Sequence, residues 1–161
     1  GIKFDTIEHA LKINEQMPKY ITNSIEEKLQ NQGLKKNVLV CGLSYKANVE
    51  DMRDSPSFKI IQELKKKNFK IFGYDPFFNS DLIEKYLIEN HISELNFTKL
   101  DNLDDKTIKE ISCMCIVQHH DENKLRIKEI YDKSLIPFIY DCQSKLVKNL
   151  QSNSHLEFLG N

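Results

Sequence analysis

Two cations in one short segment, Lys46 and Arg53, are the side chains of this 161-residue sequence best suited to bind an anionic ligand. Lysine supplies a compact point charge, whereas the planar guanidinium of arginine fits the oxygen atoms of a phosphate. Both lie within residues 43–55, which run into Ser55-Pro56, a pair typical of a helix start, where free amide groups attract anions. The segment indicates either an anion-binding loop or a solvated loop whose cations pair with acidic neighbours, namely Glu50, Asp51 and Asp54.

The run His119-His120-Asp121-Glu122 has residue types that could bind a metal ion. Adjacent histidines point to opposite sides of an extended chain, so we favour helix capping by Asp121 and a place for His119 beside the ligand crevice. No metal site is therefore predicted. Asp75 ends an apolar run and could bind a ribose hydroxyl, but a turn formed with Pro76 is the preferred interpretation.

The four cysteines, at positions 41, 113, 115 and 142, have neither Cys-x-x-Cys nor zinc-site spacing. We interpret them as reduced thiols that pack in the core, because free cysteine is among the most buried residue types. The spacing of Cys113 and Cys115 leaves open a cysteine-dependent enzyme in which one of these two thiols is reactive.

Composition excludes several classes of function. The chain has 23 basic and 24 acidic side chains, and this balance argues against nucleic-acid binding. Its five glycines, at 1, 33, 42, 73 and 160, form neither a dinucleotide-binding loop nor a phosphate-binding P-loop. No apolar run approaches the roughly 20 residues of a membrane span, and the first residues do not resemble a signal peptide. We therefore expect a cytoplasmic protein without a membrane partner.

Hydrophobic patterning divides the chain into alternating strands and helices. Residues 5–32 predict a helix with a kink or break at Met17-Pro18 and a left-handed cap at Gly33. Short apolar runs then predict strands at 38–42, 70–74, 95–98, 112–117, 138–140 and 157–159. Helices are predicted between them at 55–67, 79–90, 105–111 and 122–132. This order is typical of a Rossmann-like open parallel sheet with helices on both faces, here preceded by an N-terminal helix.

The predicted sheet places the cationic segment where ligands bind. Residues 43–55 follow the first strand of the sheet. Ligands of open α/β sheets bind beyond the carboxyl ends of the strands. The segment is also longer than the usual strand-to-helix connection of about two to six residues.

Residues 38–57 resemble the first strand and loop of the C-terminal, UDP-binding domain of the UDP-glucose/GDP-mannose dehydrogenase family. The family pattern is Gly-Leu-x-Tyr/Phe-Lys, followed after a polar stretch by Asp-x-Arg-x-Ser-Pro or Ser-Ser. This sequence matches each of these positions, including the spacing from lysine to arginine. The resemblance extends over essentially the whole chain through three further matches, at 13–18, 74–76 and 117–119.

The resemblance implies a part of a longer enzyme. Family members oxidise the C6 alcohol of a nucleotide sugar to a carboxylate in two NAD-dependent steps, through a thiohemiacetal on a cysteine. Residues 1–33 would be the tail of the central helical region, and residues 34–161 the UDP-sugar-binding domain. None of the four cysteines lies in the family's Gly-Gly-x-Cys-x-x-Lys-Asp segment, so the resemblance implies no catalytic residue here and an inactive isolated fragment. NAD would be held mainly by an N-terminal domain outside this chain, in a homodimer or higher oligomer.

The resemblance also assigns roles to individual residues. Lys46 would contact the nucleotide sugar, Tyr45 would line the uridine site, and Arg53 would reach the NAD pyrophosphate across a domain interface. Many members carry Asp-Gly-Arg late in the sheet, but Gln143 stands in place of that arginine, and Lys145 could supply the missing cation. This departure, with the Ser-Pro form of the loop, is more similar to the branch that acts on UDP-N-acetylhexosamines. A stand-alone, non-catalytic nucleotide-binding or regulatory module is the alternative.

Overall fold

The computed structural model describes residues 5–90, 92, 97–100, 102–146 and 156–158, with side chains from residue 11 and outside 97–100 and 156–158. Within these residues, six parallel strands form one sheet in the order β3-β2-β1-β4-β5-β6. This is the strand order of a doubly wound, Rossmann-like sheet, as the sequence predicts. The strands are β1 (Asn37–Cys41), β2 (Lys70–Tyr74), β3 (Phe97–Leu100), β4 (Cys113–Ile116), β5 (Phe138–Asp141) and β6 (Leu156–Phe158).

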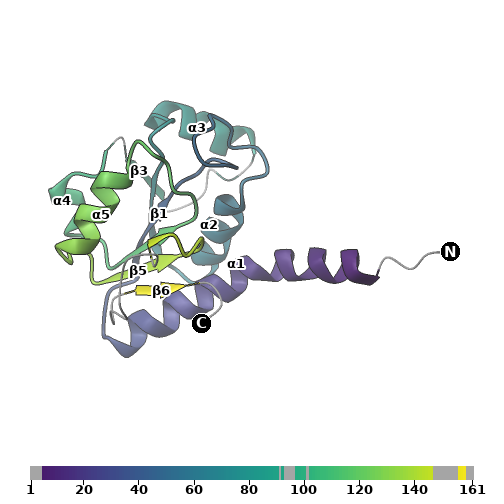
Figure 1. Cartoon of the computed structure of the whole chain (residues 1–161), viewed down its shortest axis with the longest axis horizontal. Helices are drawn as coiled ribbons and strands as arrows, with labels where there is room; N and C mark the ends of the chain where they lie inside the picture. Colours follow the sequence, from purple (N-terminus) through teal and green to yellow (C-terminus); the bar gives the residue numbers. More distant parts are fainter. Residues whose placement is uncertain (1–4, 91, 93–96, 101, 147–155, 159–161) are drawn as a thin grey trace.

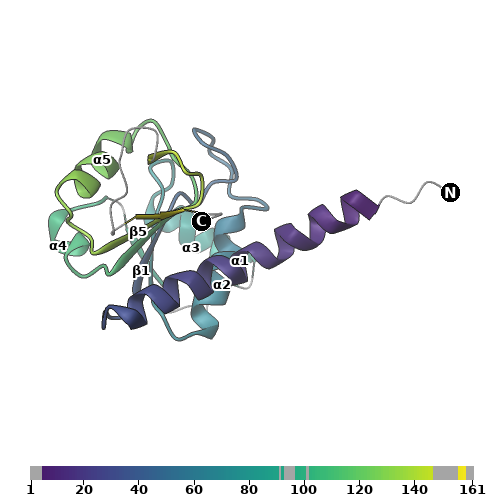
Figure 2. The same ribbon diagram turned by 60° about the horizontal axis from the view of Figure 1, so that its bottom comes forward.

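Helices cover both faces of this sheet (Figures 1 and 2). They are α1 (Asp5–Asn31), α2 (Pro56–Lys66), α3 (Ser80–Glu89), α4 (Asp105–Ile108) and α5 (Lys124–Asp132). The central strands are apolar throughout because alternate residues enter different cores. Val38 and Val40 of β1 pack with side chains of α1, α2 and α3, whereas Leu39 packs with side chains of α4 and α5.

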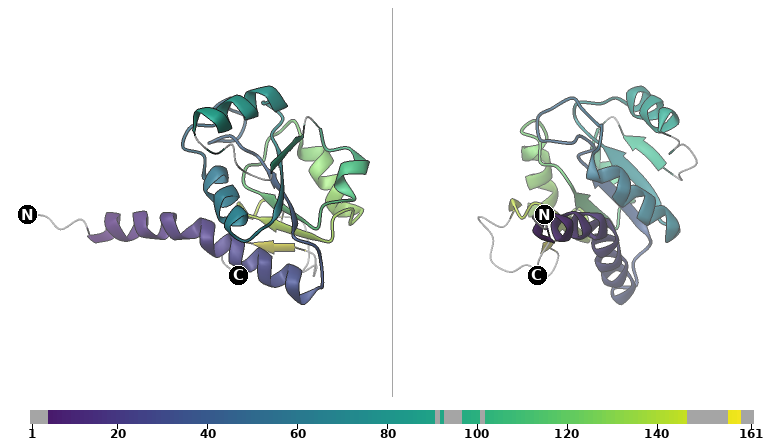
Figure 3. Two further views of the ribbon diagram at one scale, coloured as in Figure 1. Left: turned by 180° about the vertical axis from the view of Figure 1, so that it is seen from behind. Right: turned by 90° about the vertical axis from the view of Figure 1, so that its right-hand side faces the viewer.

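The long helix α1 ends where the sequence predicts. Gly33 has φ +64°, and the bonds Gly33 N–H to Gln30 O and Leu34 N–H to Leu29 O form a Schellman cap. The predicted break at Pro18 does not occur, because α1 continues through that residue. The helix changes direction along its length, as the right-hand view of Figure 3 shows, and proline is a common cause of such bends.

The N-terminal half of α1 projects beyond the rest of the domain (Figures 1 and 3). Ile21, Ile25 and Leu29, from the second half, are buried in the core. Leu11 and Ile13, from the first half, are each 58% exposed. The helix therefore buries only part of its apolar surface against this domain.

Most predicted elements are present, with shifted ends. The third strand is Phe97–Leu100 rather than 95–98, and residues 95 and 96 lie outside the described part. The last strand is Leu156–Phe158, and residue 159 of the predicted range also lies outside it. The predicted cap at Asp121 is wrong, since α5 begins after Asn123. The predicted start of α2 is confirmed, because the Ser55 side chain accepts the amide of Ser57.

Candidate functional site

The loop of residues 43–55 leaves the sheet at the point where the strand order reverses. Strand β1 has β2 and β3 on one side, and β4, β5 and β6 on the other. The carboxyl edge at such a switch point is where doubly wound sheets bind ligands. His119 and His120 follow β4 at the same edge, and His120 contacts the loop through the Asn48 amide.

Gly42 joins β1 to this loop and cannot be replaced without strain. Its φ is +87°, and a Cβ there would lie 2.5–2.7 Å from Gln118 atoms, mostly backbone. Its N–H donates to the Tyr74 carbonyl at 2.8 Å, and its carbonyl accepts the Ser57 hydroxyl at 2.7 Å. The position therefore requires glycine both for its backbone conformation and for the close approach of β4.

The carboxylate of Asp75, at the end of β2, holds the first residues of the loop. Its Oδ2 accepts the Leu43 amide at 2.7 Å, the Ser44 amide at 2.9 Å and the Ser44 hydroxyl at 2.6 Å. Its Oδ1 accepts the Phe77 amide at 3.0 Å, which is the turn that the sequence predicts. The side chain is 1% exposed. Both carboxylate oxygens are thus engaged by donors of the protein itself.

The pKa of Asp75 reflects this environment. Burial acts to raise the pKa, but hydrogen bonds from His120, Ser44 and the Phe77 amide outweigh burial and lower it. Asp75 is therefore a carboxylate at neutral pH and accepts all of these bonds in its charged form.

Residues after β4 hold the middle of the loop. The Asn48 amide donates to His120 Nδ1 at 3.0 Å. The Asn48 side chain donates to Asp121 Oδ2 at 2.8 Å and accepts the Asp121 amide at 2.9 Å. These contacts hold Asn48 in a left-handed conformation, with φ +59°. Asp121 thus binds the loop instead of capping α5.

A pair of glutamines connects the loop to β5. Gln118 Nε2 donates to the Tyr45 carbonyl at 3.1 Å, and Gln143 Nε2 donates to Gln118 Oε1 at 2.6 Å. Gln143, which the sequence resemblance sets in place of the family arginine, is therefore two hydrogen bonds away from Tyr45. Lys145 lies farther along, at a hollow of about 530 Å³ that it lines together with His119 and other residues.

His119 and Asp141 form a second histidine–carboxylate contact. His119 Nε2 lies 2.9 Å from Asp141 Oδ1, and the Asp141 carboxylate also accepts the amides of Gln143 and Leu146 at 2.9 Å. Burial acts to raise the pKa of Asp141, but the hydrogen bond from His119 and those from the backbone amides lower it. His119 follows β4 at the carboxyl edge of the sheet, and its ring is turned toward Asp141.

The predicted substrate-binding residues lie on the outside of the loop. Tyr45 is 47% exposed, and the Lys46 Nζ lies 5.4 Å from the centre of its ring. Among the described residues, no acidic side chain pairs with Lys46. Within the loop, the Tyr45 amide donates a 2.7 Å hydrogen bond to the Asp51 carbonyl. Tyr45 and Lys46 thus form one surface, with a cation beside an aromatic ring.

The predicted cofactor-binding residue, Arg53, is paired within the loop. Its Nε and Nη2 donate to the two oxygens of Asp51 at 3.0 and 2.8 Å. This hydrogen bond lowers the pKa of Asp51 to about 2. The Arg53 side chain is 83% exposed. The sequence left open either anion binding or pairing with acidic neighbours, and the structure shows this pairing for Arg53 but not for Lys46.

The cysteines offer no reactive centre within the described residues. Cys41, Cys113 and Cys115 are fully buried, and the partly buried Cys142 has its Sγ 3.8 Å from that of Cys115. The hydrogen bond with Cys142, together with burial, raises the pKa of Cys115, and burial raises that of Cys41. A thiol with a raised pKa is a poor nucleophile at neutral pH, and the geometry gives no support to a cysteine-dependent enzyme.

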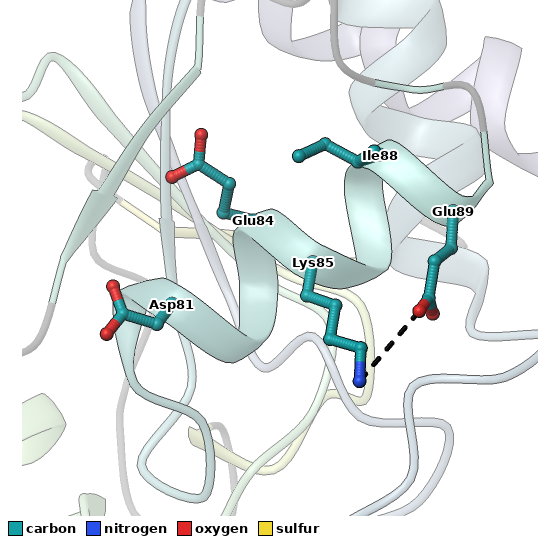
Figure 4. Close-up of a pocket in the computed structure, with 5 residues that line it drawn as sticks. All are labelled: Asp81, Glu84, Lys85, Ile88 and Glu89. Carbon is teal, nitrogen blue, oxygen red and sulfur yellow. Dashed lines mark ion pairs between the residues drawn. The ribbon is translucent and has the colours of Figure 1, made fainter.

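The hollow on α3 does not suit a phosphate ligand, and the described residues form no metal centre. A hollow of about 410 Å³ on α3 is lined by one lysine and three acidic side chains (Figure 4). Its charge would repel a nucleotide, and Lys85 already lies 3.9 Å from Glu89. In the described part of the chain, no three histidine, cysteine or acidic side chains gather as metal ligands.

Comparisons of the sequence with a family model and with known proteins all identify nucleotide-sugar dehydrogenases as similar. Residues 39–148 match the model of the UDP-glucose/GDP-mannose dehydrogenase family, UDP binding domain. The chain is 33% identical to the UDP-N-acetyl-D-mannosamine dehydrogenase of Methanococcus vannielii, over 96% of this chain and 34% of that protein. It is 28% identical to the UDP-glucose 6-dehydrogenase of Rickettsia conorii, over 94% of this chain and 32% of that protein.

A solved structure shares the fold. The UDP-D-ManNAc dehydrogenase of Pyrococcus horikoshii superposes with a TM-score of 0.69 at 20% identity, over 99% of this chain and 34% of that one. The chain thus spans about a third of the length of the relatives that it matches.

Replacing Gly42 tests the contact with Gln118. We expect Gly42→Ala to lower the free energy of unfolding by about 2–4 kcal/mol, because overpacking and a positive φ both oppose the added methyl group. Gly33→Ala is the matched control, since Gly33 also has a positive φ but has no atom within 4 Å of an added Cβ. Urea unfolding measures both variants. Equal losses would show that the close approach of Gln118 imposes no constraint.

The lowered pKa of Asp75 predicts acid sensitivity. A carboxylate with a lowered folded-state pKa stabilises the protein above the unfolded-state pKa, near 4, and this contribution disappears as the pH falls through the folded-state pKa. We expect Asp75→Asn to be less stable than wild type at pH 6 and to lose less stability between about pH 5 and pH 3. The exposed Asp81→Asn is the control. A pH dependence of Asp75→Asn identical to wild type would contradict this role.

Thiol alkylation tests the cysteine interpretation. In the native chain we expect iodoacetamide to modify Cys142 first, since Cys41, Cys113 and Cys115 are fully buried. Mass spectrometry identifies the modified residue, and Cys142→Ser should leave the native chain nearly unreactive. Rapid modification of Cys113 or Cys115 would revive the cysteine-dependent enzyme.

Proposed function

The chain belongs to the UDP-glucose/GDP-mannose dehydrogenase family, and from this premise we propose that it is the nucleotide-sugar-binding domain of an NAD-dependent UDP-sugar 6-dehydrogenase. The whole enzyme would oxidise the sugar C6 alcohol to a carboxylate, with NAD accepting the hydride in each of two steps. Residues 1–33 would be the tail of the central helical region, and residues 34–161 the UDP-binding domain.

One observation carries this proposal, namely the exposed Tyr45–Lys46 surface on a loop that is held at the switch point of the sheet. The Lys46 ammonium has no acidic partner among the described residues, so a diphosphate would meet a cation that is not already neutralised. The half-exposed ring of Tyr45 could stack on a planar base such as uracil. A cation beside an aromatic surface suits a pyrimidine diphosphate.

Arg53 would bind the NAD pyrophosphate on a neighbouring domain. Its side chain is 83% exposed, and among the described residues Asp51 is the one acidic partner that holds the guanidinium. Exposed ion pairs contribute about 0–1 kcal/mol, so a pyrophosphate could displace Asp51 at little cost. The pairing would also hold the guanidinium extended in the absence of cofactor.

The exposed half of α1 supports a domain within a longer protein. Leu11 and Ile13 are exposed on a helix that projects away from the sheet, and further parts of a central helical region would cover them. We therefore favour this function over a stand-alone module, and we expect the isolated chain to be inactive. The full-length enzyme would be a homodimer or a higher oligomer.

We also propose a cytoplasmic location. All four cysteines are free thiols, which is typical of a reducing compartment. Within the described residues, no helix has the length and apolar character needed to cross a membrane.

The proposed substrate is a UDP-N-acetylhexosamine. The M. vannielii relative carries the name UDP-N-acetyl-D-mannosamine dehydrogenase and is 33% identical, against 28% for the R. conorii UDP-glucose 6-dehydrogenase. Gln143 also replaces the arginine found in many members, and its amide is committed to Gln118. Assays of the full-length enzyme with NAD and a panel of UDP-sugars would test this choice, and a preference for UDP-glucose would contradict it.

Two alanine variants of the full-length enzyme test the roles of the loop cations. Lys46→Ala should raise the KM for the UDP-sugar about 10- to 100-fold, the range for losing a charge-assisted contact, with little change in the KM for NAD. Arg53→Ala should raise the KM for NAD more than that for the sugar. Lys59→Ala, on the exposed face of α2, is the control. Equal effects of Lys46→Ala and Arg53→Ala on both ligands would contradict this division of roles.

A further inference from the structure

His120 is a buried residue that contacts Asn48, at one end of the segment carrying Lys46, and Asp75, which holds the other end. It is 1% exposed, its Nδ1 accepts the Asn48 amide at 3.0 Å, and its Nε2 lies 3.2 Å from Asp75 Oδ2. Its ring centre is 5.2 Å from that of Phe77. His120 therefore lies between the middle of the loop and the carboxylate that holds its start.

The contact with Asn48 decides which ring nitrogen acts as the acceptor. A backbone amide can only donate, so His120 Nδ1 must be an unprotonated acceptor in this arrangement. The ring hydrogen then lies on Nε2, which faces the negatively charged Asp75. A hydrogen on Nδ1 would place two donors against each other and break the contact with Asn48.

Residues 44–48 form a short segment that is held at both of its ends. Ser44, at one end, binds Asp75 Oδ2 through its amide and hydroxyl. Asn48, at the other end, donates its amide to His120 Nδ1, and His120 Nε2 lies 3.2 Å from the same oxygen, an electrostatic contact without hydrogen-bond geometry. Lys46 lies midway between the two ends, so the Asp75 carboxylate and the His120 ring help to set where its backbone lies, beside the bonds that Tyr45 makes with Gln118 and Asp51.

We propose that His120 is a positioning residue for the nucleotide-sugar site, which sets the reach of Lys46 by holding the Asn48 amide. The role of Lys46 in this inference rests on the proposed function. His120 itself would not touch the ligand, because it is buried beneath the loop. The two bonds between the Asn48 side chain and Asp121 are a separate tether that does not depend on His120.

Two substitutions of His120 separate the hydrogen bond from simple packing. In His120→Asn the side-chain oxygen takes the place of Nδ1 and can accept the Asn48 amide, whereas His120→Leu fills the space without an acceptor. Asn48→Gly is the matched control, since it retains the amide and tolerates the positive φ but removes the Asp121 tether.

The first readout is NMR of the chain itself and does not depend on any ligand. We expect the His120 nitrogen shifts of the native chain to show hydrogen on Nε2 and none on Nδ1. Hydrogen exchange at the Asn48 amide should be about 3- to 10-fold faster in His120→Leu, the range for losing one hydrogen bond, and close to native in His120→Asn. The amides of β5 serve as the internal standard, and equal exchange there shows that each variant is folded. An Nδ1-protonated ring, or exchange unchanged in His120→Leu, would overturn the inference.

The second readout is the KM of the full-length enzyme. His120→Leu should raise the KM for the UDP-sugar about 3- to 10-fold with little change in the KM for NAD, and His120→Asn should restore it. A KM unchanged in His120→Leu, or raised equally in both variants, would overturn the positioning role. Lys46→Ala separates failure of the positioning role from failure of the proposed function. If the proposed function is wrong, Lys46→Ala also leaves the KM for the UDP-sugar unchanged; if only the positioning role is wrong, Lys46→Ala still raises it.

Discussion

The buried carboxylate of Asp75 is the interaction on which the carboxyl edge of the sheet, where we propose the nucleotide-sugar site, depends. An ionised group inside a protein is costly unless hydrogen bonds replace its hydration. Here the amides of Leu43 and Ser44, the Ser44 hydroxyl and the Phe77 amide replace it. The charge of one side chain just after β2 thereby makes the start of the neighbouring loop a fixed extension of β1. A loop ordered before the ligand arrives loses less conformational entropy on binding.

The two adjacent histidines contact carboxylates on opposite sides of the chain segment that follows β4. His120 faces Asp75, at the end of β2, and His119 faces Asp141, at the end of β5. Because successive residues of an extended chain point in opposite directions, β4 can contact both flanking parts of the sheet. Loop and sheet are therefore connected by charged and polar contacts, while the apolar layers beneath hold the strands in register.

The sequence predicts the strands and helices better than the contacts between the loop and the sheet. Apolar runs, Gly33 and Ser55 follow local rules, so the strands, the α1 cap and the start of α2 could be placed from the chain alone. The role of Asp75 depends on residues more than 30 positions away, which meet only because β1 and β2 pair in parallel. The Asp121 cap was wrong for the same reason, since its carboxylate is used by Asn48, 73 residues earlier. Gly42 is an intermediate case. The sequence shows a glycine at the end of the strand, but it does not show that Gln118 packs closely against it.

Hydrogen exchange of the Leu43 and Ser44 amides in the ligand-free chain tests the central claim most directly. Both amides lie outside any strand, and within the described part of the chain the Asp75 carboxylate is their one acceptor. If that carboxylate makes the loop start part of the sheet, the two amides should exchange as slowly as the central residues of β1. Exchange at the rate of an exposed loop would show that the loop is not organised before the ligand binds, and would contradict the account.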